Sequence, residues 1–255
     1  MNIFVLLCFQ AAFFTVSAID EREAADDRVP PIDIANQEGG DIRAYGQQGI
    51  WNVYQDVDVK FFIPYVFDRV TDYKYWEVDN IRLAMEIISN NTCIRFRERR
   101  NEPQYFRIKN GKGGCYSNLG RTLSLEEHTI MLQSDDTGRC TYVKIVVHEL
   151  IHAIGFNHEH NRYDRDYHVK IHMDNVLQNQ THNFQTVSQY ESRTFGFPYD
   201  YHSIMHYGNT SFATDMTKLT METLDRRYKG IIGNAYLPTE SDYKRICLLY
   251  GCQGR

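Results

Sequence analysis

The sequence has no clustered basic region and no long apolar run beyond its N-terminal segment. Its 28 Lys and Arg residues stand against 33 Asp and Glu residues, so the formal net charge is −5. A nucleic-acid-binding surface needs a basic cluster, so we expect no nucleic-acid partner. A membrane-spanning helix needs roughly 18 consecutive apolar residues, so we expect no membrane span. No internal repeat is apparent, and the apolar fraction of 42% is that of an ordinary globular protein.

The N-terminal segment indicates the compartment. Residues 1–18 combine a short apolar run with small residues, and Val16 and Ala18 occupy the positions that signal peptidase prefers. The segment lacks the Lys or Arg that usually precedes such a run. A buried first helix is the alternative, but the acidic, polar residues that follow have little with which to pack around it. We therefore expect a signal peptide at residues 1–18 and a secreted, extracellular protein.

Residues 19–48 form a second region of distinct composition. They are acidic, contain several Gly and Pro residues and are poor in periodic apolar positions. Such a composition is typical of a pro-segment or a disordered tail. We place the end of this pro-segment between residues 43 and 50. Residues 49–255 then form the main domain, in which we expect ordered structure to begin with a strand near residues 59–67.

Hydrophobic periodicity outlines an α+β domain. One helical face of residues 76–89 is apolar, which predicts an amphipathic helix packed on a sheet. Residues 92–97 and 105–109 favour short strands, and a glycine-rich turn follows them. A second long helix is expected within residues 140–156, ending at Gly155, and a closing helix within residues 240–250. The pieces between these two helices are short and irregular.

The cysteines are an odd number once the signal peptide is removed. An oxidising compartment then favours two disulfides and one leftover thiol, and the connectivity cannot be deduced from the sequence alone. The five cysteines are Cys93, Cys115, Cys140, Cys247 and Cys252. The sequons at Asn90, Asn179 and Asn209 are compatible with the same compartment, and we expect at least one of them to carry sugar.

The stretch HELIHAIGFNHEHNRYDR carries the strongest chemical signal. His148 and His152 are four residues apart, so on a helix both imidazoles leave the same face and can bind one metal ion. Glu149 lies beside the first ligand, where it reaches a metal-bound water, and this placement suits a general base. Gly155 lets the chain leave the helix, so that His158 can return as a third ligand. Three neutral nitrogens are typical of a catalytic zinc site.

Chance is a poor explanation for this pattern. A lone HExxH arises in about one in forty chains of this composition, and a solvated helix face explains it equally well. The added Gly and His at fixed spacing make such a coincidence rare. We therefore expect one Zn²⁺ per chain.

The same stretch resembles the signature of a known family. It matches the astacin-family pattern HExxHxxGxxHExxRxDR at every defined position, and residues 203–207, SIMHY, look like the Met-turn of that family. FIPYVF, NTCIRF, GCYSNLGR and LLYGC are similar to further family landmarks, so the resemblance covers essentially residues 60–252. The chain resembles a metzincin zinc metalloendopeptidase with a signal peptide, a pro-segment and a catalytic domain only.

The resemblance implies a fold and further roles. The fold would be two-lobed and zincin-like, with a mixed sheet and long helices in the N-terminal lobe and an irregular C-terminal lobe. Met205 would form an apolar floor beneath the zinc ion. Tyr207 would be a zinc ligand at rest and would hold the oxyanion during catalysis, while Glu149 acts as general base. Glu159 would bind the N-terminus created by activation. An extended protein or peptide substrate would pair with an edge strand near residues 115–121.

The resemblance also implies the disulfides. Cys93 would pair with Cys252, and Cys115 with Cys140. Cys247 would then be unpaired, and its place in ICLLY suits a buried small hydrophobe.

The resemblance to this family also implies that the chain is made as a latent precursor. Astacin-like pro-segments carry an F-x-G-D element whose aspartate occupies the water position on the zinc ion, and Asp41 is the candidate here. The expected phenylalanine is missing from QEGGD. An aspartate in a flexible acidic tail is the alternative reading of Asp41.

A second function remains open. A catalytically inactive secreted zinc-binding or matrix-interaction protein, derived from such a protease, would keep the histidines but lose Glu149 or Tyr207. Both residues are present. We expect a monomer that acts on protein or peptide substrates.

Overall fold

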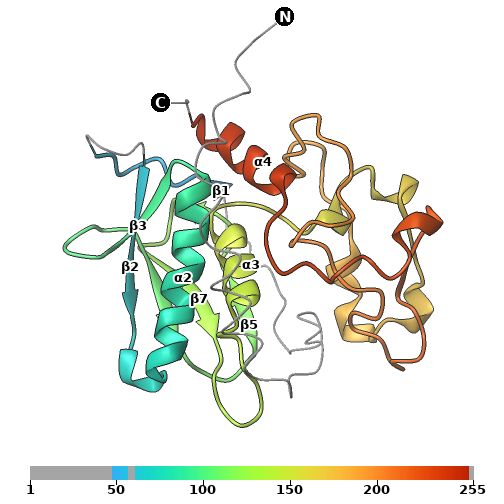
Figure 1. The fold of residues 1–255 in the computed structure, drawn as a ribbon, viewed down its shortest axis with the longest axis horizontal. Coiled ribbons are helices and arrows are strands. Elements are labelled where there is room, and N and C mark those ends of the chain that lie inside the picture. Colours follow the sequence, from blue (N-terminus) through green and yellow to red (C-terminus); the bar gives the residue numbers. More distant parts are fainter. Residues whose placement is uncertain (1–47, 57–60, 253–255) are drawn as a thin grey trace, which may run out of the picture.

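A five-stranded mixed sheet forms the N-terminal half of the computed structural model, which describes residues 48–56 and 61–252 (Figure 1). The strand order is β3-β2-β4-β7-β5, so β5 lies at one edge. Strand β5 is antiparallel to β7, whereas the other neighbours run parallel. The strands are β2 (Phe61–Phe67), β3 (Ile94–Glu98), β4 (Tyr105–Lys109), β5 (Cys115–Ser117) and β7 (Glu127–Leu132).

Two helices lie side by side along this sheet (Figure 1). Helix α2 (Tyr75–Asn91) buries an apolar face at helical spacing, as the sequence predicts. Helix α3 (Val143–Ala153) is shorter than predicted at its start, because Cys140 still belongs to the preceding loop, where its N–H donates to the Gln133 carbonyl. The helix ends before Gly155 as expected. Gly155 has a φ of +117°, a conformation that other residues resist.

Ordered structure begins earlier than predicted. Strand β1 (Gln48–Gly49) pairs with β6 (Arg121–Thr122), and Trp51 is fully buried. The indole Nε1 of Trp51 donates to the Ala153 carbonyl at 3.0 Å, near the end of α3. The expected start near residue 59 is therefore too late. Residues 50–54, IWNVY, are too short a run to show a helical or strand period, so the pattern does not reveal the burial of Trp51.

The C-terminal half is irregular, which confirms the two-lobed α+β arrangement. It has its own apolar cluster around Phe184, Tyr207 and Phe212. Helix α4 (Glu240–Tyr250) instead returns to the first lobe, where Ile246 and Tyr250 join the main core (Figure 1). A small sheet of β8 (Val169–Ile171) and β9 (Met221–Thr223) lies in this half. The 3-10 helices among the described residues are η2 (Val70–Asp72), η3 (Glu159–Asn161), η4 (Arg165–Tyr167), η5 (Met173–Asn175), η6 (Gln178–Phe184) and η7 (Arg226–Tyr228). Within residues 48–56 and 61–252, no helix has both the length and the apolar character that crossing a membrane requires.

Two disulfides join elements that are distant in the sequence. Cys93–Cys252 links the end of α2 to the end of α4, and Cys115–Cys140 links β5 to the segment before α3. These are the pairings that the resemblance implies. Cys247 is also disulfide-bonded. The expectation of an unpaired Cys247 is therefore wrong. It rested on the odd count of cysteines after residue 18.

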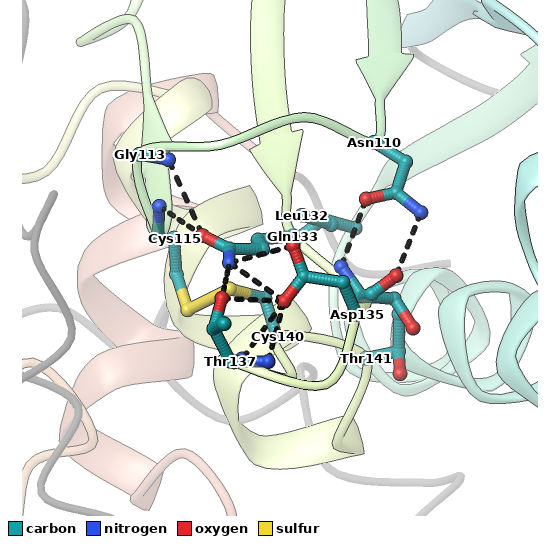
Figure 2. Close-up of a disulfide and its surroundings, with 12 residues drawn as sticks. Asn110, Gly113, Cys115, Leu132, Gln133, Asp135, Thr137, Cys140 and Thr141 are labelled. Atoms are coloured by element: carbon teal, nitrogen blue, oxygen red, sulfur yellow. Dashed lines mark hydrogen bonds between the residues drawn. A yellow bond between two sulfur atoms is a disulfide. The ribbon is translucent and has the colours of Figure 1, made fainter.

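Gln133 ties together two loops beside the Cys115–Cys140 disulfide (Figure 2). Its Oε1 accepts hydrogen bonds from the N–H groups of Gly113 and Gly114, at 3.2 and 2.8 Å. Its Nε2 donates to Asp135 at 3.0 Å and to Thr137 at 2.8 Å. The glycine-rich turn that leads into the edge strand is thus held by one buried side chain.

We predict that Gln133→Leu lowers the free energy of unfolding by about 1–3 kcal/mol, because it leaves the N–H groups of Gly113 and Gly114 without an acceptor. Chemical denaturation followed by circular dichroism measures this change. Gln185→Leu, at an exposed position, is the matched control and should change stability by less than about 0.5 kcal/mol. Equal effects of the two substitutions would contradict the role given to Gln133.

Candidate functional site

Three buried histidines converge at the end of α3. His148 and His152 lie on the helix and His158 in the loop that follows it, and each is 3% exposed. Their Nε2 atoms lie 3.0, 3.0 and 3.2 Å from one another. A tetrahedral zinc ion with Zn–N distances of about 2.05 Å would separate its nitrogen ligands by about 3.3 Å. The cluster therefore fits a single zinc ion.

The hydrogen bonds of the other ring nitrogens set the chemical state of the cluster. His148 Nδ1 lies 2.8 Å from the Ile204 carbonyl oxygen, and His152 Nδ1 lies 2.6 Å from that of Phe156. Because a carbonyl oxygen only accepts, Nδ1 carries the proton in both rings and the Nε2 lone pair points inward. Burial lowers the pKa of His148 to about 4, and lowers the pKa values of His152 and His158 well below the ordinary value. These are neutral imidazoles with facing lone pairs, the state that a metal ligand needs.

Glu149 is the buried acid of the site. It is 1% exposed, and its Oε2 has no hydrogen-bond partner among the residues that the structure describes. Burial raises the pKa of its carboxyl group to about 8. The Ser117 hydroxyl donates to the Glu149 backbone carbonyl at 2.9 Å, and the Gly120 N–H donates to the His152 carbonyl at 3.0 Å. The segment that begins with edge strand β5 is therefore fixed directly to the helix that carries the ligands.

Met205 and Tyr207 lie on the turn that faces the third histidine. Both are buried, at 2% and 4% exposed. The rings of Tyr207 and His158 have centroids 4.3 Å apart, and His160 stacks on Tyr207 at 4.0 Å. The Glu159 N–H donates to the Met205 carbonyl at 2.8 Å. The structure thus brings the proposed floor and the proposed oxyanion donor against the loop of His158.

The Glu159 carboxylate accepts several hydrogen bonds from the folded chain. It accepts hydrogen bonds from Arg162 at 2.9 Å, from Arg245 at 2.7 Å and from the Asp200 N–H at 2.9 Å. Burial alone would raise the pKa of Glu159, but the two guanidinium groups hold it below its ordinary value. Asp41 lies outside the described residues, as does the expected signal peptide at residues 1–18. The binding of a new N-terminus at Glu159 thus remains an expectation.

Asp242 and Arg245 were not identified from the sequence, although they belong to the buried ion-pair network of Glu159. The spacing of Thr239 and Asp242 is that of a capping box, which could have placed Asp242 near the start of a helix. Nothing in that local pattern reveals contacts with residues far earlier in the chain. Nothing in the sequence around Ser117, other than its place in GCYSNLGR, indicates that it contacts the ligand helix.

Comparison with known proteins agrees with this geometry. The chain is 40% identical over 203 residues to zinc metalloproteinase nas-5 of Caenorhabditis elegans, which covers 79% of this chain and 55% of that relative. It is 38% identical over 192 residues to zinc metalloproteinase nas-6 of the same organism, which covers 75% of this chain and 53% of that relative. The chain therefore spans a little over half the length of these two curated relatives.

A solved structure is similar over most of the fold. High choriolytic enzyme 1, a hatching enzyme zinc-protease from the medaka fish Oryzias latipes, superposes with a TM-score of 0.71 at 33% identity, and the match covers 80% of this chain and 95% of that one. Residues 54–251 match the family model described as Astacin (Peptidase family M12A). The chain therefore belongs to the astacin family.

Proposed function

We propose that this chain is a secreted zinc-dependent endopeptidase that hydrolyses peptide bonds of proteins. The observation that carries the proposal is the convergence of three imidazole nitrogens beside the buried Glu149 carboxylate, whose Oε2 has no hydrogen-bond partner within residues 48–56 and 61–252. A structural zinc site would fill the fourth position with a protein ligand and would have no need of such a carboxylate. Family membership supports the same chemistry.

Each residue of the site has one task in this proposal. His148, His152 and His158 would hold the zinc ion, which when bound activates a water and polarises a peptide carbonyl. Glu149 takes the proton of the attacking water and passes it to the leaving amine. Tyr207 would help to hold the ion at rest and would donate to the developing oxyanion, and Met205 would supply an apolar floor to the site.

The edge strand offers a place for the substrate. β5 lies at the edge of the sheet and is fixed to α3 through Ser117. Its outer backbone groups can pair with an extended peptide and so bring the scissile carbonyl toward Glu149. Protein and peptide substrates follow from this mode of binding.

Processing and localisation are further parts of the proposal. We place a signal peptide at residues 1–18, a pro-segment at residues 19–48 and the catalytic domain at residues 49–255. Burial of Trp51 supports a domain that starts near residue 49. The disulfides support an oxidising compartment and hence secretion.

The alternative is a catalytically inactive zinc-binding or matrix-interaction protein. It would keep the metal site without a need for the groups that act on substrate. Glu149 and Tyr207 are both buried beside the histidines, and this favours the enzyme.

Glu149→Gln should leave zinc content unchanged and lower kcat/KM on an unfolded protein substrate by about 10²–10⁴-fold, because the amide cannot accept the proton of water. Metal analysis and a proteolysis assay on the purified mature chain measure both quantities. Glu222→Gln, on an exposed strand position, is the control and should keep full activity. Near-normal hydrolysis by Glu149→Gln would remove it from the general-base role.

Removal of zinc should abolish proteolysis and lower the melting temperature, since a ligand that binds only the folded chain stabilises it. A zymogram with and without a chelator tests activity, and a thermal melt before and after restoring Zn²⁺ tests stability. His152→Ala should show no melting shift with Zn²⁺. A chain that binds zinc but never cleaves protein would favour the inactive alternative.

Asp41→Ala should give an unprocessed chain that is active without cleavage, if the aspartate blocks the zinc ion as proposed. The unprocessed wild-type chain should be latent until it is cleaved between residues 43 and 50. Proteolysis assays on both chains, with N-terminal sequencing to exclude processing, make the comparison. Latency that is the same in both would exclude Asp41 from the mechanism.

A further inference from the structure

We propose that Asp242, on the C-terminal helix α4, is a positioning residue for the zinc ligand His148. The proposal rests on the zinc site proposed above and adds a residue that lies outside the family signature quoted from the sequence. It is carried by a chain of hydrogen bonds from α4, through the turn at residues 203–205, to the imidazole of His148.

Every acceptor position of the Asp242 carboxylate is filled by a hydrogen bond from the folded chain. It is 3% exposed. Its Oδ1 accepts from the Ser203 hydroxyl at 2.7 Å and from Arg245 at 2.8 Å. Its Oδ2 accepts from the Ile204 N–H at 3.2 Å and from the Thr239 N–H at 3.0 Å. A carboxylate offers about four acceptor sites, so these four donors saturate it and fix its orientation.

Ile204 links the fixed carboxylate of Asp242 to the metal site. The Ile204 N–H is held by Asp242, and the Ile204 carbonyl accepts the hydrogen bond from His148 Nδ1 at 2.8 Å. The Met205 N–H donates to the Ser203 hydroxyl oxygen at 3.0 Å, which closes the turn around Ile204. The orientation of this carbonyl decides the tautomer of His148 and the direction of its Nε2 lone pair. Asp242 therefore sets the geometry of His148 through Ile204.

A second branch of the same network reaches the loop of His158. Arg245 donates to Asp242 at 2.8 Å and to Glu159 at 2.7 Å, and all three side chains are buried. Glu159 directly follows His158, and its N–H donates to the Met205 carbonyl. Buried charges of this kind are strongly coupled, because removal of one leaves its partner uncompensated. The network thus joins α4 to the surroundings of two ligands.

Apolar contacts and polar links together hold the turn against α4. Ile204, Met205 and Ile246 belong to one buried apolar cluster. Beside this cluster lies a small cavity, and its walls are Ile151, Phe156, Asn157, Met205, Asp242 and Arg245. Apolar contacts have no fixed direction, so the hydrogen bonds of Asp242 are what orient the peptide groups of the turn.

Helix α4 is itself held in place by covalent and apolar contacts. Its last turn is joined to the end of α2 by the Cys93–Cys252 disulfide, and Ile246 and Tyr250 are buried in the main core. Its first turn is fixed by a capping box in which Asp242 and Thr239 bond each other. The metal site thus depends on the packing of a helix near the end of the chain.

The test compares Asp242→Asn with Thr239→Ala, a control that weakens the same helix and removes the hydrogen bond from Thr239 to Asp200, but keeps the bonds from Asp242 to the turn. The asparagine amide places an N–H group where an oxygen accepted, so at least one link to Ser203 or Ile204 is lost. We expect zinc affinity, measured by chelator competition, to fall about 10–100-fold, as is typical when a group that orients a metal ligand is removed. The visible absorption spectrum of the Co²⁺-loaded chain should change with it, because the spectrum reports ligand geometry.

Thr239→Ala removes the hydroxyl that caps α4 but keeps the bonds from Asp242 to Ser203 and Ile204. This control should melt at a lower temperature and retain the wild-type zinc affinity and cobalt spectrum. If Asp242→Asn does not fold, Ser203→Ala takes its place, because it breaks the same path without changing a charge. It should lower zinc affinity and alter the cobalt spectrum in the same direction.

The outcomes separate the two proposals. A wild-type chain that binds no zinc would overturn the proposed zinc site. A wild-type chain that binds zinc, together with folded Asp242→Asn or Ser203→Ala variants of unchanged affinity and cobalt spectrum, would overturn the role of Asp242. Loss of affinity in Thr239→Ala equal to that in Asp242→Asn would also overturn it, since general weakening of α4 would then explain both.

Discussion

Three imidazole Nε2 atoms held about 3 Å apart are the constraint on which this structure depends. Neutral rings in this arrangement repel one another until a cation joins them, so the fold must hold them in place. Helix α3 supplies two of the rings, and Gly155 lets the chain turn back with the third. The Ile204 and Phe156 carbonyls then fix the tautomers of His148 and His152.

Several elements around the ligands hold that geometry. The edge strand is joined to α3 by Ser117 and to the segment before α3 by the Cys115–Cys140 disulfide, so the proposed substrate position is held against the helix that carries two ligands. On the other side, α4 reaches the turn at residues 203–205 through Asp242. The site is therefore built from segments far apart in the sequence, and the disulfides and buried ion pairs hold those segments together.

The sequence predicts those parts of the site that local spacing determines. His148 and His152 follow from helical periodicity, and Gly155 follows from the need for positive φ at the helix end. The α+β class and strands β2, β3 and β4 follow from apolar patterns. Burial of Trp51 and the links made by Asp242 and Arg245 could not be predicted, because each depends on a partner far away in the chain.

The central claim is that His148, His152 and His158 together hold one zinc ion and leave room for a reacting group. X-ray absorption spectroscopy of the zinc-loaded wild-type chain tests this most directly. The account predicts three imidazole nitrogens at about 2.0–2.1 Å with oxygen completing the shell. A sulfur ligand, or fewer than three imidazoles around the zinc ion, would contradict it.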